Sequence, residues 1–279
     1  MKTFIVLGII LFAWLVFAQS CMKFHISDEE AKKQFSEAGV LLQIENVEVD
    51  GFNMHYVKTG IDSFPTLLFV HGSPGSWDAF SRYLKDKELL AKYRMISIDR
   101  PGFGDSEFGK AKDLEEQSKL ISPLLTFFKN NKPVYVIGHS LGGPMAVRLV
   151  ADNPEYFSGM ILLSGSEDPA EEKPEKWRPI LYKTPLKFLV PGAFRPSNQE
   201  LWYLKKDLVI LKKDFSKITC PVWIIHGDKD DMVPVGNAAF AKQMLVNAKK
   251  VETKILPGAN HFIPWQHYAE IKEVLMGLE

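Results

Sequence analysis

The chain is poor in cysteine and has no excess charge, and each of these absences excludes a class of protein. Cys21 and Cys220 are its only two cysteines among 279 residues, too few for a disulfide framework. Lysine plus arginine and aspartate plus glutamate number 34 each, so the net charge is zero. Because no basic cluster with interleaved aromatic residues occurs either, we expect no nucleic-acid partner.

Motifs for metals and cofactors are also missing. The sequence contains no HExxH, no paired CxxC and no phosphate-binding loop, so we expect neither a metal nor a cofactor. It has no internal repeat and no low-complexity tract. A chain of 279 residues with 24% charged residues suits one large globular domain, or a core with one insertion.

The N-terminus has the pattern of an export signal. Met1-Lys2-Thr3 is a short cationic start, and an uninterrupted apolar run covers residues 4–17. Small residues follow at Ala18 and Ser20, the positions that a signal peptidase reads. The run is short for a transmembrane helix, which needs about 20 residues. We therefore expect residues 1–20 to be a cleaved signal peptide, with an uncleaved anchor as the alternative.

The residues at this cleavage point, Ala18-Gln19-Ser20-Cys21, resemble the lipobox of bacterial lipoproteins, with Ala18 and Gln19 in place of the usual leucine and small residue. The resemblance implies a lipidated Cys21, a polar tether over residues 21–39, and an exported lipoprotein on the periplasmic or cell-surface side of a membrane. Ordinary cleavage at the same bond would give a secreted soluble protein. Cys220 precedes an apolar run and is interpreted as a core residue.

From residue 40 onward, apolar strands alternate with helical segments. A hairpin is predicted first, with strands 41–49 and 52–59 joined at Asp50-Gly51. Further strands are expected at 66–70, 93–98, 134–137, 160–163, 222–225 and 251–256, and helices at 113–128, 141–151, 235–246 and 268–278. This alternation predicts one α/β domain over residues 40–279, with a mostly parallel central sheet and helices on both faces.

One segment, residues 167–215, interrupts the alternation. It is rich in proline and lysine and carries scattered aromatic residues, among them Trp177 and Trp202. Because a structureless loop of this length is improbable in a compact domain, we expect a small helical cap inserted before the strand at 222–225. Its aromatic residues are predicted to cover the active-site pocket and select an apolar group, unless they pack the cap's own core.

The run Gly138-His-Ser-Leu-Gly142 supplies a candidate nucleophile, Ser140. It fits the G-x-S-x-G pattern on a strand-to-helix turn, the nucleophile elbow. Glycines are needed there because the sharp turn brings neighbouring backbone too close for side chains. The turn lifts the hydroxyl clear of the sheet, and the N-terminus of the following helix points free N–H groups at the reacting centre.

A serine nucleophile needs a base and an orienting acid. His261 is the preferred base because it lies in the loop after the last strand, whereas His267 lies near the start of the final helix. The other histidines are placed in the tether, in the hairpin or beside glycines at strand ends: His25, His55, His71, His139 and His226. The acid stays open among four aspartates that follow strands: Asp168, Asp228, Asp230 and Asp231.

The loop His71-Gly-Ser-Pro-Gly75 follows the strand at 66–70 and is rich in small residues. Such a loop can aim backbone N–H groups at a developing oxyanion, and the expected donors are the amides of Ser73 and Leu141. A plain tight turn is the alternative for this loop.

Together these residues resemble the α/β-hydrolase family, over roughly residue 41 to the C-terminus. The order serine, aspartate, histidine is that family's order. The family's G-x-x-D-x-x-V-P spacing, laid on residues 227–234, selects Asp230 as the acid. Residues 99–106 (DRPGFGDS) resemble a turn whose role in the family is mainly structural. The family's dehalogenases and epoxide hydrolases share the HG-x-P loop, but their nucleophile is an aspartate. Ser140 at this position argues against both activities.

The resemblance implies a serine hydrolase that cleaves a carboxylic ester through an acyl-enzyme, with Ser140 as nucleophile, His261 as base and Asp230 as orienting acid. Its expected partners are a small-molecule ester and, through lipid on Cys21, a membrane. The alternatives are carbon–carbon or amide bond hydrolysis on the same triad, a non-catalytic binding protein on the same scaffold, and a structural lipoprotein with no small ligand.

Overall fold

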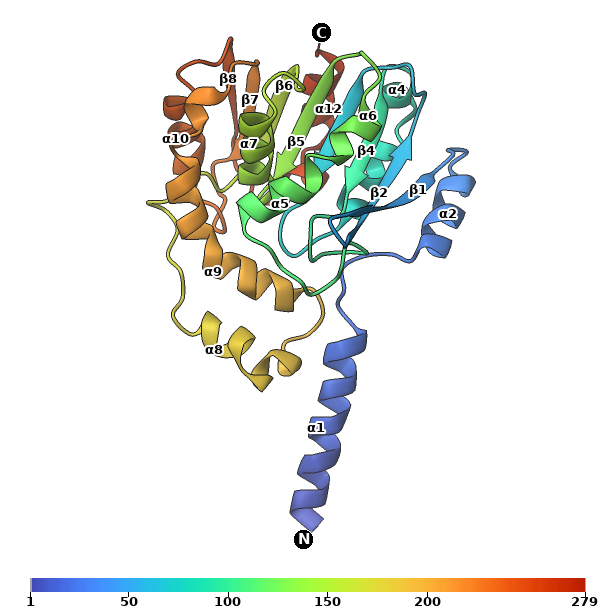
Figure 1. The fold of residues 1–279 in the computed structure, drawn as a ribbon, viewed down its shortest axis with the longest axis vertical. Helices are drawn as coiled ribbons and strands as arrows, with labels where there is room; N and C mark the ends of the chain where they lie inside the picture. Colours follow the sequence, from blue (N-terminus) through green and yellow to red (C-terminus); the bar gives the residue numbers. More distant parts are fainter. Residues whose placement is uncertain (1, 279) are drawn as a thin grey trace.

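The computed structural model describes residues 2–278 and contains one eight-stranded sheet (Figure 1). The strand order is β1-β2-β4-β3-β5-β6-β7-β8. β1 (Gln43–Val49) and β2 (Phe52–Thr59) form the predicted hairpin, and β2 pairs antiparallel with β4 (Arg94–Ile98). All other neighbours pair in parallel: β3 (Thr66–Val70), β5 (Val134–His139), β6 (Gly159–Leu163), β7 (Val222–Gly227) and β8 (Val251–Leu256). The predicted fold class is confirmed.

Helices cover both faces of the sheet, which explains why its inner strands are apolar throughout. In β3, Leu68 and Val70 enter the core on one face, while Leu67 and Phe69 enter the core on the other. The first core is covered by α5 (Leu114–Ile121), α6 (Leu124–Phe128), α7 (Gly142–Asp152) and α10 (Gly236–Met244). The second is covered by α2 (Asp28–Glu37), η1 (Trp77–Phe80), α3 (Ser81–Leu84), α4 (Lys87–Leu90), α11 (Ile263–Gln266) and α12 (Tyr268–Met276).

The single helix expected at 113–128 is divided into α5 and α6. Asp113 caps α5 through a capping box with Glu116. Pro123 has no N–H to donate, so the chain cannot continue the first helix through it, and α6 begins at Leu124.

The prediction of a polar tether over residues 21–39 is wrong for most of these residues. Residues 28–37 form α2, whose Ala31 and Phe35 are fully buried. The Phe35 ring lies 6.0 Å from the ring of Trp77, centroid to centroid. These two apolar positions, four residues apart, face the core while the charged residues between them face solvent. The packed domain therefore begins before residue 40.

The insertion between β6 and β7 is helical, as the sequence predicts. It contains α8 (Arg178–Lys183), η2 (Pro185–Leu189), α9 (Phe194–Leu211) and η3 (Phe215–Lys217). α9 packs on the sheet side through Leu204, Leu208 and Leu211. By contrast, α8 and η2 contain no buried residue, and α8 lies at the outer end of the insertion (Figure 1). We refer to this insertion as the cap.

The N-terminal helix α1 (Lys2–Ser20) projects from the end of the molecule that carries the cap, opposite the C-terminus (Figure 1). Its stretch Thr3–Ser20 has a mean hydropathy of 2.2 and is long and apolar enough to cross a membrane, a test that a signal sequence also passes. Of the expected signal segment, Met1 lies outside the described residues.

The C-terminal end of α1 is hydrogen-bonded to the cap, which the sequence does not predict. The indole of Trp14 donates to the Leu189 carbonyl at 3.0 Å. Gln19 donates to the Phe188 carbonyl at 2.8 Å. The Gly192 amide donates to the Ala18 carbonyl at 3.0 Å.

Candidate active site

Ser140 lies on a strained turn between β5 and α7. Its φ of +55° falls in the left-handed region, which non-glycine residues adopt uncommonly and at some cost in backbone strain. A β-carbon at Gly138 would lie 2.1 Å from the Gly142 carbonyl oxygen, and one at Gly142 would lie 2.2 Å from the Val70 carbonyl oxygen. The two glycines are therefore required by backbone contacts, as the G-x-S-x-G pattern predicts.

His261 and Asp230 form a buried pair next to this turn. Nδ1 of His261 lies 2.7 Å from Oδ2 of Asp230. The other carboxylate oxygen of Asp230 accepts the amides of Met232 at 3.0 Å and Val233 at 2.8 Å. Burial by itself raises the pKa of Asp230, but the hydrogen bonds from His261 and the Val233 amide lower it overall. An ionised Asp230 holds the proton of His261 on Nδ1 and leaves Nε2 to accept one.

The competing candidates have other partners. Asp228 accepts the Gly258 amide at 2.6 Å, and Asp168 accepts the Ala170 amide at 2.8 Å. Asp231 is exposed. His267 lies 3.0 Å from Glu270 at the start of α12. Among the four aspartates considered from the sequence, Asp230 is the one that contacts His261.

Two buried histidines hold the loops around Ser140. Burial, together with the neighbouring His261, lowers the pKa of His139 to about 3, so its neutral ring donates from Nε2 to the His261 carbonyl at 3.1 Å. His71 donates from Nδ1 to the Gly72 carbonyl at 2.6 Å and accepts the Arg100 amide on Nε2 at 3.0 Å. Both histidines, which the sequence places beside glycines at strand ends, therefore hold the backbone of these loops.

The loop after β3 lies directly against Ser140. A β-carbon at Gly72 would lie 2.9 Å from Cβ of Ser140. Within residues 2–278, the amides of Ser73 and Leu141 donate to no protein group. Arg100 fixes the loop from behind, because its guanidinium donates to the carbonyls of His71 at 2.8 Å and Gly72 at 3.0 Å. Two amides are thus unoccupied beside the serine.

Ser140, Ser73 and His261 line one pocket of about 650 Å³, a size typical of small-molecule sites. Its apolar wall comes from distant segments of the chain: Phe24, Ile26, Pro74, Phe194, Met232, Phe262 and Trp265. Trp177 and Trp202, which we expected to cover the pocket unless they packed the cap's own core, do not line it. The cap contributes Phe194 instead, because α8 turns away from the sheet and leaves Trp177 48% exposed.

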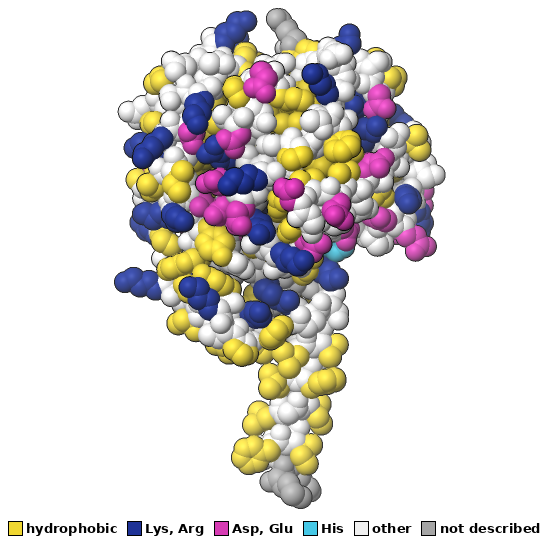
Figure 2. All heavy atoms as spheres, in the orientation of Figure 1, with side chains coloured by type: hydrophobic (Ala, Val, Ile, Leu, Met, Phe, Trp, Pro, Cys, Tyr) yellow, Lys and Arg dark blue, Asp and Glu magenta, His cyan; other side chains and the backbone are white. Residues whose placement is uncertain are grey.

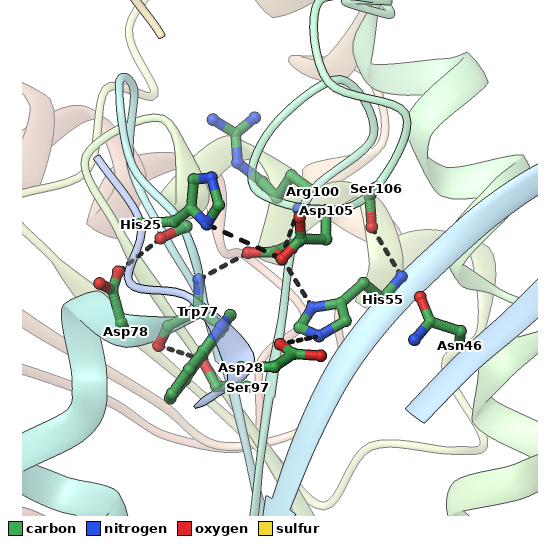
Figure 3. A network of polar contacts seen from close by, with 12 residues as sticks. His25, Asp28, Asn46, His55, Trp77, Asp78, Ser97, Arg100, Asp105 and Ser106 are labelled. Carbon is green, nitrogen blue, oxygen red and sulfur yellow. Dashed lines mark hydrogen bonds and ion pairs between the residues drawn. The ribbon is translucent and has the colours of Figure 1, made fainter. Parts of the chain in front are cut away.

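Phe24 and Ile26 belong to the segment that follows α1. The sequence did not predict that they line the pocket, because no motif distinguishes this segment. Asp78 accepts the Ile26 amide at 3.1 Å, and the hydroxyl of Ser76 donates to the Phe24 carbonyl at 2.7 Å. His25 points toward Asp105, 3.7 Å away, in the same network (Figure 3). This pocket wall is therefore fixed to the loops after β3 and β4.

Asp28, at the start of α2, continues this network to His55 on β2, 3.7 Å away (Figure 3). Nδ1 of His55 also lies 2.7 Å from Asp99. Burial lowers the pKa of His55, but Asp99 and then Asp105 and Asp28 outweigh it and raise the pKa overall. Ligand atoms of Asp28, His55 and Asp105 lie within 4.8 Å of one another, so this cluster combines one buried histidine with two carboxylates.

Sequence comparison relates the chain to hydrolases. Residues 65–189 match the family model described as alpha/beta hydrolase fold. Epoxide hydrolase 1 of Caenorhabditis elegans is 30% identical over 135 residues, which cover 47% of this chain but 33% of that protein. A 2-hydroxy-6-oxononadienedioate/2-hydroxy-6-oxononatrienedioate hydrolase of Dechloromonas aromatica is 23% identical over 265 residues, or 80% of this chain and 89% of that protein. The chain thus spans about a third of the first relative's length.

Solved structures show the same fold. A 2-hydroxy-6-oxo-6-phenylhexa-2,4-dienoate hydrolase from Rhodococcus sp. has a TM-score of 0.66 at 18% identity, covering 85% of this chain and 98% of that one. A membrane phospholipase A, described as a bacterial virulence factor, has a TM-score of 0.59 at 19% identity and covers 100% of both chains. The chain therefore has the α/β-hydrolase fold.

Proposed function

We propose that this α/β-hydrolase-fold chain is a serine hydrolase that cleaves carboxylic esters through an acyl-enzyme. The observation that carries the proposal is the hydrogen bond between His261 and Asp230, 2.7 Å long, in the pocket that Ser140 lines. A serine on a strained elbow, a histidine with its Nδ1 proton held by a buried carboxylate, and free amides nearby are the parts that acyl transfer needs.

In the proposed mechanism, Ser140 attacks the ester carbonyl while Nε2 of His261 takes its proton. The tetrahedral oxyanion accepts the amides of Ser73 and Leu141, and one such donor contributes about 2.7–4 kcal/mol in a comparable enzyme. His261 then gives its proton to the leaving alcohol. A water that His261 deprotonates attacks the acyl-enzyme and releases the acid, while Asp230 stabilises the imidazolium at both steps.

A carbon–carbon bond hydrolase on the same triad is the second candidate. The Dechloromonas relative is named for a keto-dienedioate, a compound with no ester, so its hydrolysis breaks a carbon–carbon bond. Such a dianion calls for cationic side chains, and among the described residues that line the pocket there is no lysine or arginine. This apolar lining favours an ester. The epoxide hydrolase similarity concerns less than half of the chain, and Ser140 stands where those enzymes carry aspartate.

We also propose that the protein is exported and attached to a membrane at its N-terminal segment. The sequence favours cleavage before Cys21 and lipidation of its exposed thiol, whereas the hydrogen bonds of Trp14, Ala18 and Gln19 to the cap favour retention of α1. Intact-mass analysis of membrane-extracted protein separates the two routes. A diacylglyceryl Cys21 at the N-terminus supports the lipoprotein, an N-terminus at residue 1 or 2 supports a retained helix, and an N-terminus at an unmodified Cys21 contradicts both.

The test of activity is a panel of p-nitrophenyl esters of increasing chain length, with a fluorophosphonate probe as a label. Wild-type protein is expected to hydrolyse the esters and to be labelled at Ser140. Ser140→Ala should lose activity by a factor on the order of 10⁶ and lose all labelling. Unlabelled wild-type protein, or turnover retained in purified Ser140→Ala protein, would contradict the assignment; an inert but folded wild type would support a binding protein.

A further inference from the structure

One exposed side of the pocket lies where α1 meets the cap. Phe24, four residues beyond α1, packs edge-on against Phe194 of the cap, with ring centroids 5.3 Å apart. Both side chains line the pocket, and both are more than a third exposed. Two residues earlier, the Met22 carbonyl accepts the Ala193 amide at 2.9 Å. A membrane attached at α1 or at Cys21 would therefore adjoin this exposed side of the pocket.

The outer face of the cap has the composition of a membrane-binding surface. We define the cap face as residues 173–195, which contain six lysine or arginine residues and one acidic residue, Glu175, in a chain of zero net charge. Four large apolar side chains are between 41% and 56% exposed: Trp177, Ile180, Leu186 and Phe188. Figure 2 shows apolar and cationic side chains intermingled over this region, next to α1.

This combination fits an interface between lipid and water. Exposed aromatic and aliphatic residues insert among the acyl chains near the headgroups, while lysine and arginine attract anionic headgroups. Trp14 and Phe17 occupy the end of α1 that meets the cap, and aromatic residues are enriched at the membrane interface. The cap face and the end of α1 therefore define one level, at which the bilayer surface would lie.

We propose that the cap face rests on a bilayer containing anionic phospholipid, and that the pocket takes an acyl-ester lipid directly from that bilayer. The proposal rests on the proposed ester hydrolysis by Ser140 and names its substrate class. An acyl chain would leave the bilayer, pass along the apolar surface of the packed Phe24 and Phe194 rings and place its ester at Ser140. Water is the co-reactant, and the products are a free fatty acid and the deacylated lipid.

The experiment uses full-length protein reconstituted into phosphatidylcholine vesicles with and without phosphatidylglycerol. The cap-face variant carries Lys187→Glu and Phe188→Ser. The matched control carries Phe127→Ser and Lys129→Glu, an exposed pair of the same types at the end of α6. Fatty-acid release from the vesicles and hydrolysis of p-nitrophenyl butyrate in detergent are measured for each protein.

Wild-type protein should release fatty acid, and faster from vesicles with phosphatidylglycerol. In the cap-face variant, the rate of fatty-acid release from vesicles should fall about tenfold, whereas the rate of butyrate hydrolysis should fall less than about twofold. The control variant should keep both rates. Retained butyrate hydrolysis also shows that the variant is folded. A wild type that cleaves butyrate but no vesicle lipid, or variants that behave alike, would overturn the inference and leave the proposed function standing.

A second measurement does not depend on catalysis. Vesicles that contain brominated phosphatidylcholine should quench tryptophan fluorescence less in Trp177→Phe than in the wild type, because Trp177 would lie within reach of the bromine atoms. Equal quenching of both proteins would overturn the membrane contact whatever the enzyme hydrolyses. Absence of ester hydrolysis and of fluorophosphonate labelling, with quenching as expected, would instead reject the proposed function and the lipid substrate together.

Discussion

Asp230 holds the candidate base in place and is itself held by the backbone. One of its carboxylate oxygens faces Nδ1 of His261, and the other accepts two amides from the loop after β7. This arrangement fixes both the tautomer and the rotamer of His261. Asp231, the next residue, is exposed and provides a control of the same chemistry.

Asp230→Asn should lower kcat/KM for p-nitrophenyl esters by a factor on the order of 10⁴, since an asparagine can stabilise the wrong histidine tautomer. Asp231→Asn and Asp228→Asn should retain activity within a few-fold. Steady-state kinetics on the three proteins check this prediction. If Asp231→Asn were the damaging change, Asp230 would not be the orienting acid.

Phe194 is the cap residue that reaches the pocket, whereas Trp177 lies on the outer face of the same insertion. Phe194→Ala should change the chain-length preference among soluble p-nitrophenyl esters, because it removes apolar surface from the acyl path. Each CH₂ of the acyl chain that loses its contact with Phe194 should weaken binding by about 0.8 kcal/mol, which lowers kcat/KM about fourfold. Trp177→Ala should leave that preference unchanged, and equal effects of the two changes would refute the pocket assignment.

At the level of elements, the cap is joined to the sheet by an ion pair that also supports the site. Arg100, which holds the loop beside Ser140, pairs with Glu200 of α9, and both side chains are buried. Glu200 also accepts from Gln117 of α5 at 3.1 Å. The cap helix, α5 and the loop after β3 therefore share one buried polar contact.

Glu200→Ala leaves the Arg100 charge buried without its carboxylate and should reduce the free energy of unfolding by about 3–5 kcal/mol. Glu175→Ala removes a half-exposed partner of Arg178 and should cost less than about 1 kcal/mol. Urea denaturation of both variants measures the difference. Comparable losses would show that the pair with Glu200 contributes no more than a surface contact.

For the whole molecule, a buried carboxyl group makes stability depend on pH. Glu167 follows β6 beside Gly143 and Gly165, and burial raises its pKa to about 8 from an ordinary value of 4.5. Between these values the folded protein keeps a proton that the unfolded chain has released. The contribution of Glu167 to the free energy of unfolding is therefore fully present below the ordinary pKa, and it is lost as pH rises toward 8.

Glu167→Gln stays neutral at every pH and should remove this part of the dependence. Between pH 5 and pH 8, wild-type protein should lose on the order of 3 kcal/mol more stability than the variant. Urea denaturation at both pH values checks the prediction, and the comparison cancels the contributions of other ionisable groups. Parallel losses in the two proteins would show that Glu167 is ionised in the folded state.

The sequence by itself determined the features that depend on neighbouring residues. Apolar runs and their periods located the strands and most helices, and Gly138 and Gly142 marked the turn at Ser140. Short segments such as α2 were missed because two buried positions, Ala31 and Phe35, give a weak periodic signal. The residues alone left four aspartates open, and a family spacing was needed to select Asp230.

Tertiary structure decided the features that depend on residues far apart in the chain. It brought Phe24 of the N-terminal segment, Phe194 of the cap and Trp265 of α11 to one pocket, and it turned Trp177 away from that pocket. No local pattern encodes these contacts, because the direction of a side chain follows from how whole elements pack. The same packing joined the end of α1 to the cap, through atoms 175 residues apart for Trp14 and Leu189.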